Sequence, residues 1–281
     1  MGQNYEEKKQ QLKERVQELT RKNVMIAFSG GVDSSLLLKM ATDAAKRQQT
    51  TVYAYTIHTM LHPMEELELT RTLANQMGAV YGVVQVDEME EAGIEHNPKN
   101  RCYLCKKCMF QKLLNMAGEL KAEVLIDGTN LDDTKVYRPG LQALTELGVI
   151  SPLKEAGFSK EEVRKLAKEY GISVANRPSS PCLATRFPYD VLLSREEMKK
   201  VEKMEEKLKE YGFYNVRARV HDKLLRIEVD SRDFDKMLCL KKEIVRCGKE
   251  SGYDYITLDL EGFRSGSQDL HVETNPADGV K

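Results

Sequence analysis

The sequence predicts an α/β protein, with a first domain built on a parallel sheet and a second, smaller α+β domain. Short apolar segments alternate with amphipathic, helix-like segments through most of the chain, which is the pattern of a parallel sheet covered on both faces. The length of 281 residues corresponds to about two domains, at roughly 150 residues per domain.

The composition is that of a folded protein with a polar surface. Hydrophobic residues make up 41% of the chain and charged residues 31%, which excludes a disordered or collagen-like chain. No apolar run approaches the roughly 18–20 residues that a membrane-spanning helix needs. The charged start of the chain does not resemble a secretory signal. We therefore expect a cytoplasmic protein with no membrane partner.

The net charge of the chain bears on the class of partner it binds. The net charge is −1, from 43 basic and 44 acidic residues, whereas proteins dedicated to nucleic acids usually carry a basic surplus. A nucleic-acid partner is therefore disfavoured.

Three of the six cysteines, Cys102, Cys105 and Cys108, fall within seven residues. In a cytoplasmic chain such clustering favours metal or redox chemistry over disulfides.

Each element of the first domain is expected from its apolar pattern. Tyr5–Lys22 carries the apolar stripe of an amphipathic helix, and Asn23–Phe28 is a short apolar strand. The same alternation predicts the strands Thr51–His58, Ala79–Val86 and Glu123–Asp127, and the helices Ser34–Lys46, Glu65–Met77, Lys106–Lys121 and Ser159–Tyr170. The last of these helices opens with a capping box of Ser159 and Glu162.

The second domain is expected to follow a long loop, Ser173–Asp190, which contains three prolines. Long loops of this kind are more often functional than accidental. Beyond it we expect a helix opened by a capping box of Ser194 and Glu197 and reaching Tyr211, strands over Asn215–Val220 and Leu224–Val229, a helix over Arg232–Gly248 and a strand over Tyr255–Leu260. The expected domains are residues 1–190 and 191–268, with a disordered tail at 269–281.

The string SGGVDSS at Ser29–Ser35 lies between a predicted strand and a predicted helix. Two glycines allow a sharp turn that brings backbone N–H groups toward an anion, and the helix N-terminus adds partial positive charge. The loop lacks the Gly-Lys-Ser/Thr ending of the common P-loop, and with it the lysine that reaches the terminal phosphates. A plain glycine turn is the alternative, which the full string disfavours. The predicted pyrophosphate-binding residues are Ser29, Gly30, Gly31, Asp33, Ser34 and Ser35, with Asp33 also a candidate Mg²⁺ ligand.

This string resembles the signature of the PP-loop ATP pyrophosphatases. Those enzymes cleave ATP between the α and β phosphates, transfer AMP to a substrate oxygen and release pyrophosphate. The segment Asp127–Asp133 is similar to a second element of that family, which implies that Gly128 and Asn130 also bind ATP. Both segments follow strands, and ligands of open α/β sheets bind outside the C-terminal ends of the strands. For Asp132 and Asp133, helix capping is the alternative interpretation.

The loop Arg177–Tyr189 carries one thiol, Cys182, close in sequence to Arg177 and Arg186. Nearby cations lower the pKa of a thiol and raise its thiolate fraction, which nucleophilic attack and metal ligation both require. We therefore interpret Cys182 and Arg186, together with Asp33, as catalytic residues. A buried, inert cysteine is the alternative, and the polar, proline-rich setting disfavours it.

The loop around Cys182 closely resembles that of the LarE family, the sulfur transferases that help to build the nickel-pincer nucleotide cofactor of lactate racemase. The similarity includes Gly128–Asn130, Val216–Arg219, Arg226–Val229 and Thr257–Ser267. It implies a small nucleotide substrate, pyridinium-3,5-dicarboxylate mononucleotide. ATP would adenylate a carboxylate of this substrate, and sulfur would convert it to a thiocarboxylate. The resemblance also implies a homo-oligomer, and other nickel-pincer biosynthesis proteins as partners.

The second domain contains the residues expected to hold the substrate. Arg217 and Arg219 are expected to grip its phosphate through paired donors, with a solvated strand face as the alternative. Glu228, on the next predicted strand, is a candidate Mg²⁺ ligand, although an exposed strand carboxylate is the favoured interpretation.

Two sources of sulfur stay open. In one, Cys182 attacks the acyl-adenylate and its own Cβ–S bond is then cleaved, so each chain supplies one sulfur. In the other, Cys102, Cys105 and Cys182 hold a 4Fe–4S cluster through three thiolates, and the open iron binds an extra sulfide. The Cys-x-x-Cys motif favours the cluster, because a sacrificial cysteine would not need it. We interpret Cys108 as non-ligating, since a fourth ligand would close the open iron.

Three other functions are weighed against this one. A tRNA thiolase would use the same loop and cluster, but contacts to tRNA need many cations and the charge is balanced. An amide-forming PP-loop synthase would need a source of ammonia, and no glutaminase domain is visible. A non-catalytic nucleotide-binding regulator would not require the loop thiol. Cys239 and Cys247 are interpreted as packing residues.

Overall fold

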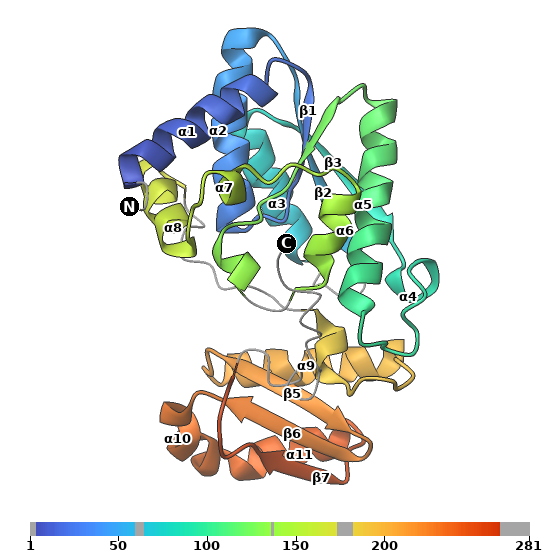
Figure 1. Cartoon of the computed structure of the whole chain (residues 1–281). Helices are drawn as coiled ribbons and strands as arrows, with labels where there is room; N and C mark the ends of the chain where they lie inside the picture. Colours follow the sequence, from blue (N-terminus) through green and yellow to red (C-terminus); the bar gives the residue numbers. More distant parts are fainter. Residues whose placement is uncertain (1–3, 60–64, 136–137, 173–181, 265–281) are drawn as a thin grey trace. The chain divides into compact units, whose positions relative to one another are not determined.

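The computed structural model describes residues 4–59, 65–135, 138–172 and 182–264 (Figure 1). These residues form two compact units, one of residues 4–93 and 100–172 and the other of residues 94–99 and 182–264. Several predicted features lie outside the described residues: Arg177 with the rest of 173–181, the last three residues of the LarE-like segment Thr257–Ser267, and the tail 269–281.

A four-stranded parallel sheet forms the centre of the first unit, in the order β3-β2-β1-β4. From β1 the chain steps outward to β3 and then crosses to the other side of β1 for β4, so the crevice between the ends of β1 and β4 is a topological switch point. The α/β fold with a parallel sheet is therefore confirmed. The strands are β1 (Val24–Ala27), β2 (Val52–Thr59), β3 (Val80–Val86) and β4 (Val124–Ile126).

Helices cover both faces of this sheet because alternate side chains of each strand point to opposite sides (Figure 1). Val24 and Ile26 of β1 enter one core, whereas Met25 enters the other. The first core is completed by α1 (Tyr5–Leu19), α2 (Val32–Gln48), α3 (Glu65–Met77), α7 (Pro152–Glu155) and α8 (Lys160–Glu169), and the second by α5 (Arg101–Glu119) and α6 (Gly140–Glu146).

Helix α5 begins at Arg101, so the prediction of a start at Lys106 is wrong. Asn100, at the N-cap position that asparagine favours, accepts backbone hydrogen bonds from Tyr103 (3.0 Å) and Leu104 (3.2 Å). The helix is therefore established before the second cysteine of the motif. Consequently all three clustered cysteines lie on α5.

The ends of α8 follow the prediction more closely. The capping box of Ser159 and Glu162 is present, and its two hydrogen bonds fix the first turn. Three short helices were not predicted, because segments of four to seven residues are too short to show a helical period: α4 (Glu88–Glu91), α6 and α7. Within the described residues, no helix combines the length and apolarity that a bilayer crossing requires.

The second unit contains a three-stranded sheet in the order β5-β6-β7, with β5 and β6 antiparallel and β6 and β7 parallel. The single helix predicted over Arg232–Gly248 is wrong: two helices meet at Leu240, whose ψ of 10° departs from the helical value. The elements are α9 (Arg195–Glu210), β5 (Val216–His221), β6 (Leu224–Val229), α10 (Phe234–Cys239), α11 (Lys241–Glu250) and β7 (Tyr255–Leu258).

A short piece of the first half of the chain, residues 94–99, belongs to the second unit. The fully buried amide of Asn97 donates to the backbone carbonyls of Phe187 (3.1 Å) and Pro188 (2.6 Å). The backbone N–H of Asp190 donates in turn to the carbonyl of Asn97 (3.1 Å). Residues 182–190, which the sequence analysis assigned to the first domain, are therefore packed with the second unit.

Candidate active site

The loop after β1 turns sharply into α2. Gly30 has a φ of 70°, a conformation that glycine adopts without strain, and Gly31 is the N-cap of the helix. The hydroxyl of Ser34 donates to the carbonyl of Gly31 (3.2 Å) and accepts from the backbone N–H of Ser29 (3.3 Å). This arrangement places a tight loop at the N-terminus of a 17-residue helix, which suits the binding of phosphate.

The loop after β4 lies against this turn. A Cβ added at Gly128 would be 3.1 Å from Cβ of Asp33 and 3.1 Å from the backbone nitrogen of Ser34, so any side chain here would force these neighbours to shift. The buried Asn130 donates through Nδ2 to Oδ1 of Asp33 (3.0 Å). The structure thus brings the two predicted ATP-binding segments together at the switch point of the sheet.

Two carboxylates that follow Asn130 hold the local backbone. Oδ2 of Asp132 accepts from the backbone N–H of Lys160 (2.8 Å), in the first turn of α8. Oδ2 of Asp133 accepts from the backbone N–H of Asn130 (3.0 Å), and its Oδ1 pairs with Arg138 (2.8 Å). Hydrogen bonds from Lys135 and from the Lys160 backbone lower the pKa of Asp132. These contacts agree with the capping interpretation.

Lys160 is a residue at this site that the sequence analysis missed. Its Nζ forms an ion pair with Oδ2 of Asp33, whose other oxygen is held by Asn130. The lysine that the glycine loop itself lacks is therefore supplied from another element, the first turn of α8. No motif marks this lysine in the sequence, because it lies 127 residues from its partner.

The cysteine motif occupies the first two turns of α5. Cys102 is exposed and Cys105 is half-buried, and their spacing of three residues places both on one face of the helix. Cys108 instead packs against the second core, between the sheet and α5 and α6. Burial raises the pKa of the Cys108 thiol, and Glu91 and Glu88 raise it further, so its thiolate is disfavoured. Within the described part of the chain, no three His, Cys, Asp or Glu side chains gather as a metal site.

Cys182 belongs to the second unit, where it precedes a 3₁₀ turn over Leu183–Arg186. Its backbone carbonyl accepts from the backbone N–H of Thr185 (3.1 Å), from the Thr185 hydroxyl (2.7 Å) and from Nη1 of Arg186 (3.1 Å). The thiol itself is partly buried. These three bonds fix the backbone that carries the thiol.

Arg186 is anchored by a carboxylate that the sequence analysis missed. Nε and Nη2 of Arg186 donate to the two oxygens of Glu205, both at 2.8 Å, and each residue is at most 4% exposed. Glu205 also accepts from the backbone N–H of Ala218 (2.9 Å). A signal for it exists in the sequence: Glu205 falls on the apolar stripe of α9 with Val201 and Leu208.

The expectation that Glu228 is an exposed carboxylate is wrong, and so is the solvated-face alternative for Arg219. Glu228 is fully buried and accepts from Nε (2.8 Å) and Nη2 (3.1 Å) of Arg219, which is 4% exposed. Nη2 of Arg226 adds a third bond to Glu228 (3.3 Å). The reason is that this side of β5 is covered, because Nη1 of Arg219 also donates to the carbonyl of Thr185.

Arg217 differs from these paired arginines. Its guanidinium lies over the ring of Phe263, 5.0 Å from the centroid, and donates to the carbonyl of Val216 (2.6 Å). Burial, together with the nearby charges of Arg186 and Arg219, lowers the pKa of Arg217 to about 10. Among the described residues no carboxylate pairs with Arg217, because those nearby are already paired. This guanidinium is suited to bind an anion from solution.

Comparison with known proteins shows the family of this chain. Residues 4–135 match a family model described as a PP-loop domain. Over 243 residues the chain is 36% identical to the pyridinium-3,5-bisthiocarboxylic acid mononucleotide synthase of Lactiplantibacillus plantarum, which covers 86% of this chain and 87% of the relative. The chain belongs to the LarE family.

Two further relatives match over most of the chain. An uncharacterized protein of Synechocystis sp. is 37% identical, with 93% of this chain and 96% of the relative covered. An uncharacterized protein of Methanocaldococcus jannaschii is 32% identical, with 87% and 92% covered. Membership of the LarE family identifies the chain as a sulfurtransferase that uses ATP.

Proposed function

We propose that this enzyme converts a carboxylate of pyridinium-3,5-dicarboxylate mononucleotide to a thiocarboxylate during biosynthesis of the nickel-pincer nucleotide. The identity with the Lactiplantibacillus plantarum synthase, over nearly the whole of both chains, carries this proposal. A carboxylate oxygen attacks the α phosphorus of ATP, which gives an acyl-adenylate and pyrophosphate. A sulfur nucleophile then displaces AMP from the acyl carbon and leaves the thiocarboxylate.

The first unit supplies the ATP-binding half of this reaction. The N-terminus of α2 and the hydroxyls of Ser29, Ser34 and Ser35 are proposed to bind the pyrophosphate portion of ATP. Asp33 offers the carboxylate oxygens that Mg²⁺ prefers, and Lys160 adds a cation beside it. The role of these residues is to stabilise the negative charge that the leaving pyrophosphate develops.

The second unit supplies the substrate-binding half. Arg217 is the better candidate to bind the substrate phosphate, because the Arg219 guanidinium already donates hydrogen bonds to Glu228 and to the carbonyl of Thr185. The Phe263 ring holds the Arg217 guanidinium in place. We propose that Arg219 and Glu228 position the neighbouring backbone of β5 and β6 and do not themselves bind phosphate or Mg²⁺.

For the sulfur, we propose that Cys102, Cys105 and Cys182 hold a 4Fe–4S cluster. The exposed and half-buried thiols on one face of α5 suit two of its ligands, and the raised pKa of Cys108 suits a residue that does not ligate. Such a cluster would supply a site for an extra sulfide at its remaining iron. Sacrifice of the Cys182 sulfur is the other source, in which the chain is consumed.

Iron content and intact mass, measured on protein prepared without oxygen, distinguish the two sources of sulfur. We expect about four irons per chain, lost in Cys102→Ala and kept in Cys108→Ala, its matched control on the same helix. Intact mass should be unchanged by turnover. A colourless protein that loses the mass of one hydrogen sulfide during turnover would replace the cluster with the sacrificial mechanism.

Release of pyrophosphate tests the substrate. We expect release that depends on the pyridinium dicarboxylate nucleotide and falls in Arg217→Gln, with a rise in KM for that nucleotide. Arg232→Gln, which changes an exposed arginine of the same unit, is the control. Release that depends on tRNA instead would overturn the proposal. A cytoplasmic location, a homo-oligomeric state and partnership with other nickel-pincer biosynthesis proteins remain predictions.

A further inference from the structure

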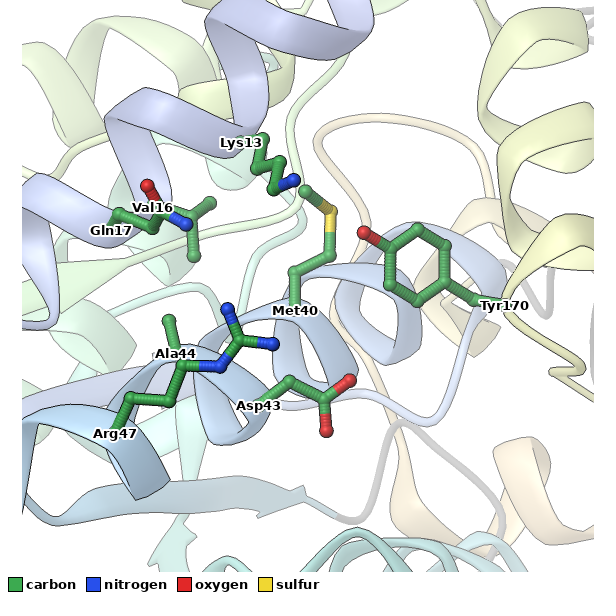
Figure 2. Close-up of a pocket in the computed structure, with 8 residues that line it drawn as sticks. All are labelled: Lys13, Val16, Gln17, Met40, Asp43, Ala44, Arg47 and Tyr170. Atoms are coloured by element: carbon green, nitrogen blue, oxygen red, sulfur yellow. The ribbon is translucent and has the colours of Figure 1, made fainter.

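A pocket of about 240 Å³ lies between α1, the second half of α2 and the end of α8 (Figure 2). We call it the α1–α2–α8 pocket. None of its lining residues belongs to the ATP-binding loops, to the cysteine motif or to the second unit. The function proposed above therefore leaves this pocket unexplained.

Part of the lining of the α1–α2–α8 pocket is apolar. Val16 and Met40, which are at most 5% exposed, line it together with Ala44. Figure 2 shows the side chain of Tyr170 reaching toward Met40 from the end of α8. Thioethers and aromatic rings both pack favourably against a flat aromatic ligand.

The α1–α2–α8 pocket is also lined by two cations, Lys13 and Arg47, and by one carboxylate, Asp43. Asp43 lines the pocket but pairs with Lys39 at 2.7 Å. Among the described residues no carboxylate pairs with Lys13 or Arg47, and both side chains turn toward Met40 (Figure 2). An anion in the pocket would therefore find two cations, one of which has the planar donor fork that matches a carboxylate.

The size of the pocket limits its ligand. A cavity of about 150 Å³ holds benzene, whereas drug-sized ligands occupy roughly 300–1,000 Å³. A volume of about 240 Å³ lies between these values and admits one ring with one small substituent.

We propose that the α1–α2–α8 pocket binds a small aromatic carboxylate, with its ring between Met40 and Tyr170 and its carboxylate on Lys13 and Arg47. The proposal does not depend on the sulfur-transfer function, since it involves neither ATP nor any cysteine. Benzoate is the simplest probe of this class.

Titration with benzoate, followed by NMR of methyl-¹³C-methionine protein, tests the site directly. Met40 is one of twelve methionines, and its signal is assigned with Met40→Leu. We expect a saturable shift of the Met40 signal in the wild-type chain. Arg47→Gln and Lys13→Gln should each weaken benzoate binding by about five- to tenfold, because each removes a charged donor to the carboxylate.

Matched controls lie on the same helices. Lys9→Gln removes a cation of α1 that pairs with Glu169, and Lys46→Gln removes one of α2 beside Gly78; neither residue lines the pocket. Both variants should bind benzoate as the wild type does. Ala44→Phe should abolish binding by filling the pocket, and thermal unfolding verifies that each variant is folded.

Three results would overturn the proposal. The first is a Met40 signal that does not move at millimolar benzoate in the folded wild-type chain. The second is equal binding by the wild type and by the Lys13 and Arg47 variants. The third is an equal response to inorganic phosphate, which would show no selection for a carboxylate, or to cyclohexanecarboxylate, which would show no selection for an aromatic ring.

Discussion

Asp33 is the point at which three segments of the first unit meet. Its two carboxylate oxygens are held by Asn130 from the loop after β4 and by Lys160 from the start of α8. The side chain of Asp33 is only 16% exposed, so this ion pair is less screened by water than a surface pair. Loss of either partner would leave one oxygen of this partly buried carboxylate without its hydrogen-bond donor.

Removing the Lys160 ammonium tests the role of that cation. In Lys160→Met we expect pyrophosphate release to fall at least about tenfold, which corresponds to about 1.4 kcal/mol of lost transition-state stabilisation. Lys160→Arg should recover part of the rate, because the charge is restored. Lys168→Met, on an exposed turn of the same helix, is the control. Wild-type turnover by a folded Lys160→Met protein would exclude a role for the cation.

Glu88 provides a test of stability against pH. It lies at the start of α4, is 1% exposed, and has an Oε2 without a hydrogen-bond partner among the described residues. Burial raises the pKa of Glu88 from 4.5 to about 7, against a hydrogen bond from Thr59 that lowers it. The folded state therefore holds this proton more tightly than the unfolded state, and loses stability as pH rises from about 4.5 to about 7.

Glu88→Gln should remove this loss, because an uncharged amide replaces the buried carboxylate. Relative to the wild type, the variant should gain up to about 3 kcal/mol in the free energy of unfolding between pH 5 and pH 8. Urea unfolding at the two pH values measures the difference. Glu90→Gln, exposed on the same helix, should show none. The same gain in both glutamine variants would contradict the burial argument.

The sequence identified the residues of these sites that belong to motifs and missed those that do not. Asp33 and Asn130 were predicted because strings of neighbouring residues mark them. Lys160 was missed because a lone lysine gains meaning only from a partner far away in the chain. Glu205 could have been identified from the sequence, since a carboxylate on the apolar stripe of a helix requires a buried partner. The burial of Glu228 depends on what covers the sheet, which strand periodicity does not reveal.

At the scale of elements, the close approach of the loops after β1 and β4 builds the ATP site. The contact is permitted by a missing side chain, since a Cβ at Gly128 would meet Asp33 and the backbone of Ser34 at 3.1 Å. Backbone atoms at this distance cannot rotate away as a flexible side chain can. The geometry of the cradle therefore depends on the separation of the two loops.

Gly128→Ala should widen that separation. We expect ATP affinity to fall by about tenfold, and the free energy of unfolding to fall by about 1–3 kcal/mol from overpacking. The control is Gly118→Ala in α5, where nothing lies within 4 Å of the added Cβ. That variant should gain about 0.5–1 kcal/mol from helix propensity. Calorimetric titration with an ATP analogue and urea unfolding provide the two measurements, and unchanged affinity in Gly128→Ala would contradict the steric argument.

Most elements could be predicted because their apolar periods are clear, and the exceptions have physical causes. The four strands of the first sheet match their predicted segments to within a few residues. The short helices α4, α6 and α7 offer too few residues for a period to appear. The break between α10 and α11 occurs at Leu240, where neither glycine nor proline marks a change. Nothing in the local sequence accounts for it.

At the scale of the whole molecule, the division into units does not follow chain order. Residues 94–99 lie between β3 and α5 in sequence but pack with residues from the second half of the chain. The bonds from Asn97 to Phe187 and Pro188 hold them there. Phe187 and Pro188 follow Cys182 closely in the chain, and Arg186 anchors the backbone carbonyl of Cys182.

Variants of Asn97 test how much these bonds contribute. Asn97 has a φ of 48°, which glycine tolerates and alanine does not. Asn97→Gly should lower the free energy of unfolding by about 2 kcal/mol, because the carbonyls of Phe187 and Pro188 lose their donor. Asn97→Ala should cost about 1–2 kcal/mol more from backbone strain. Equal stability of Asn97→Gly and the wild type in urea unfolding would show that the amide bonds contribute nothing.

The distance along the chain between Asn97 and its partners has a consequence for synthesis. Asn97 leaves the ribosome 90 residues before Phe187, which at 5–20 residues per second is a delay of about 5 to 20 s. Throughout that interval the amide of Asn97 lacks its partners in the folded protein. A fragment that stops after α8 would keep this segment permanently without its partners, so truncation at the apparent end of the first unit yields an incomplete product.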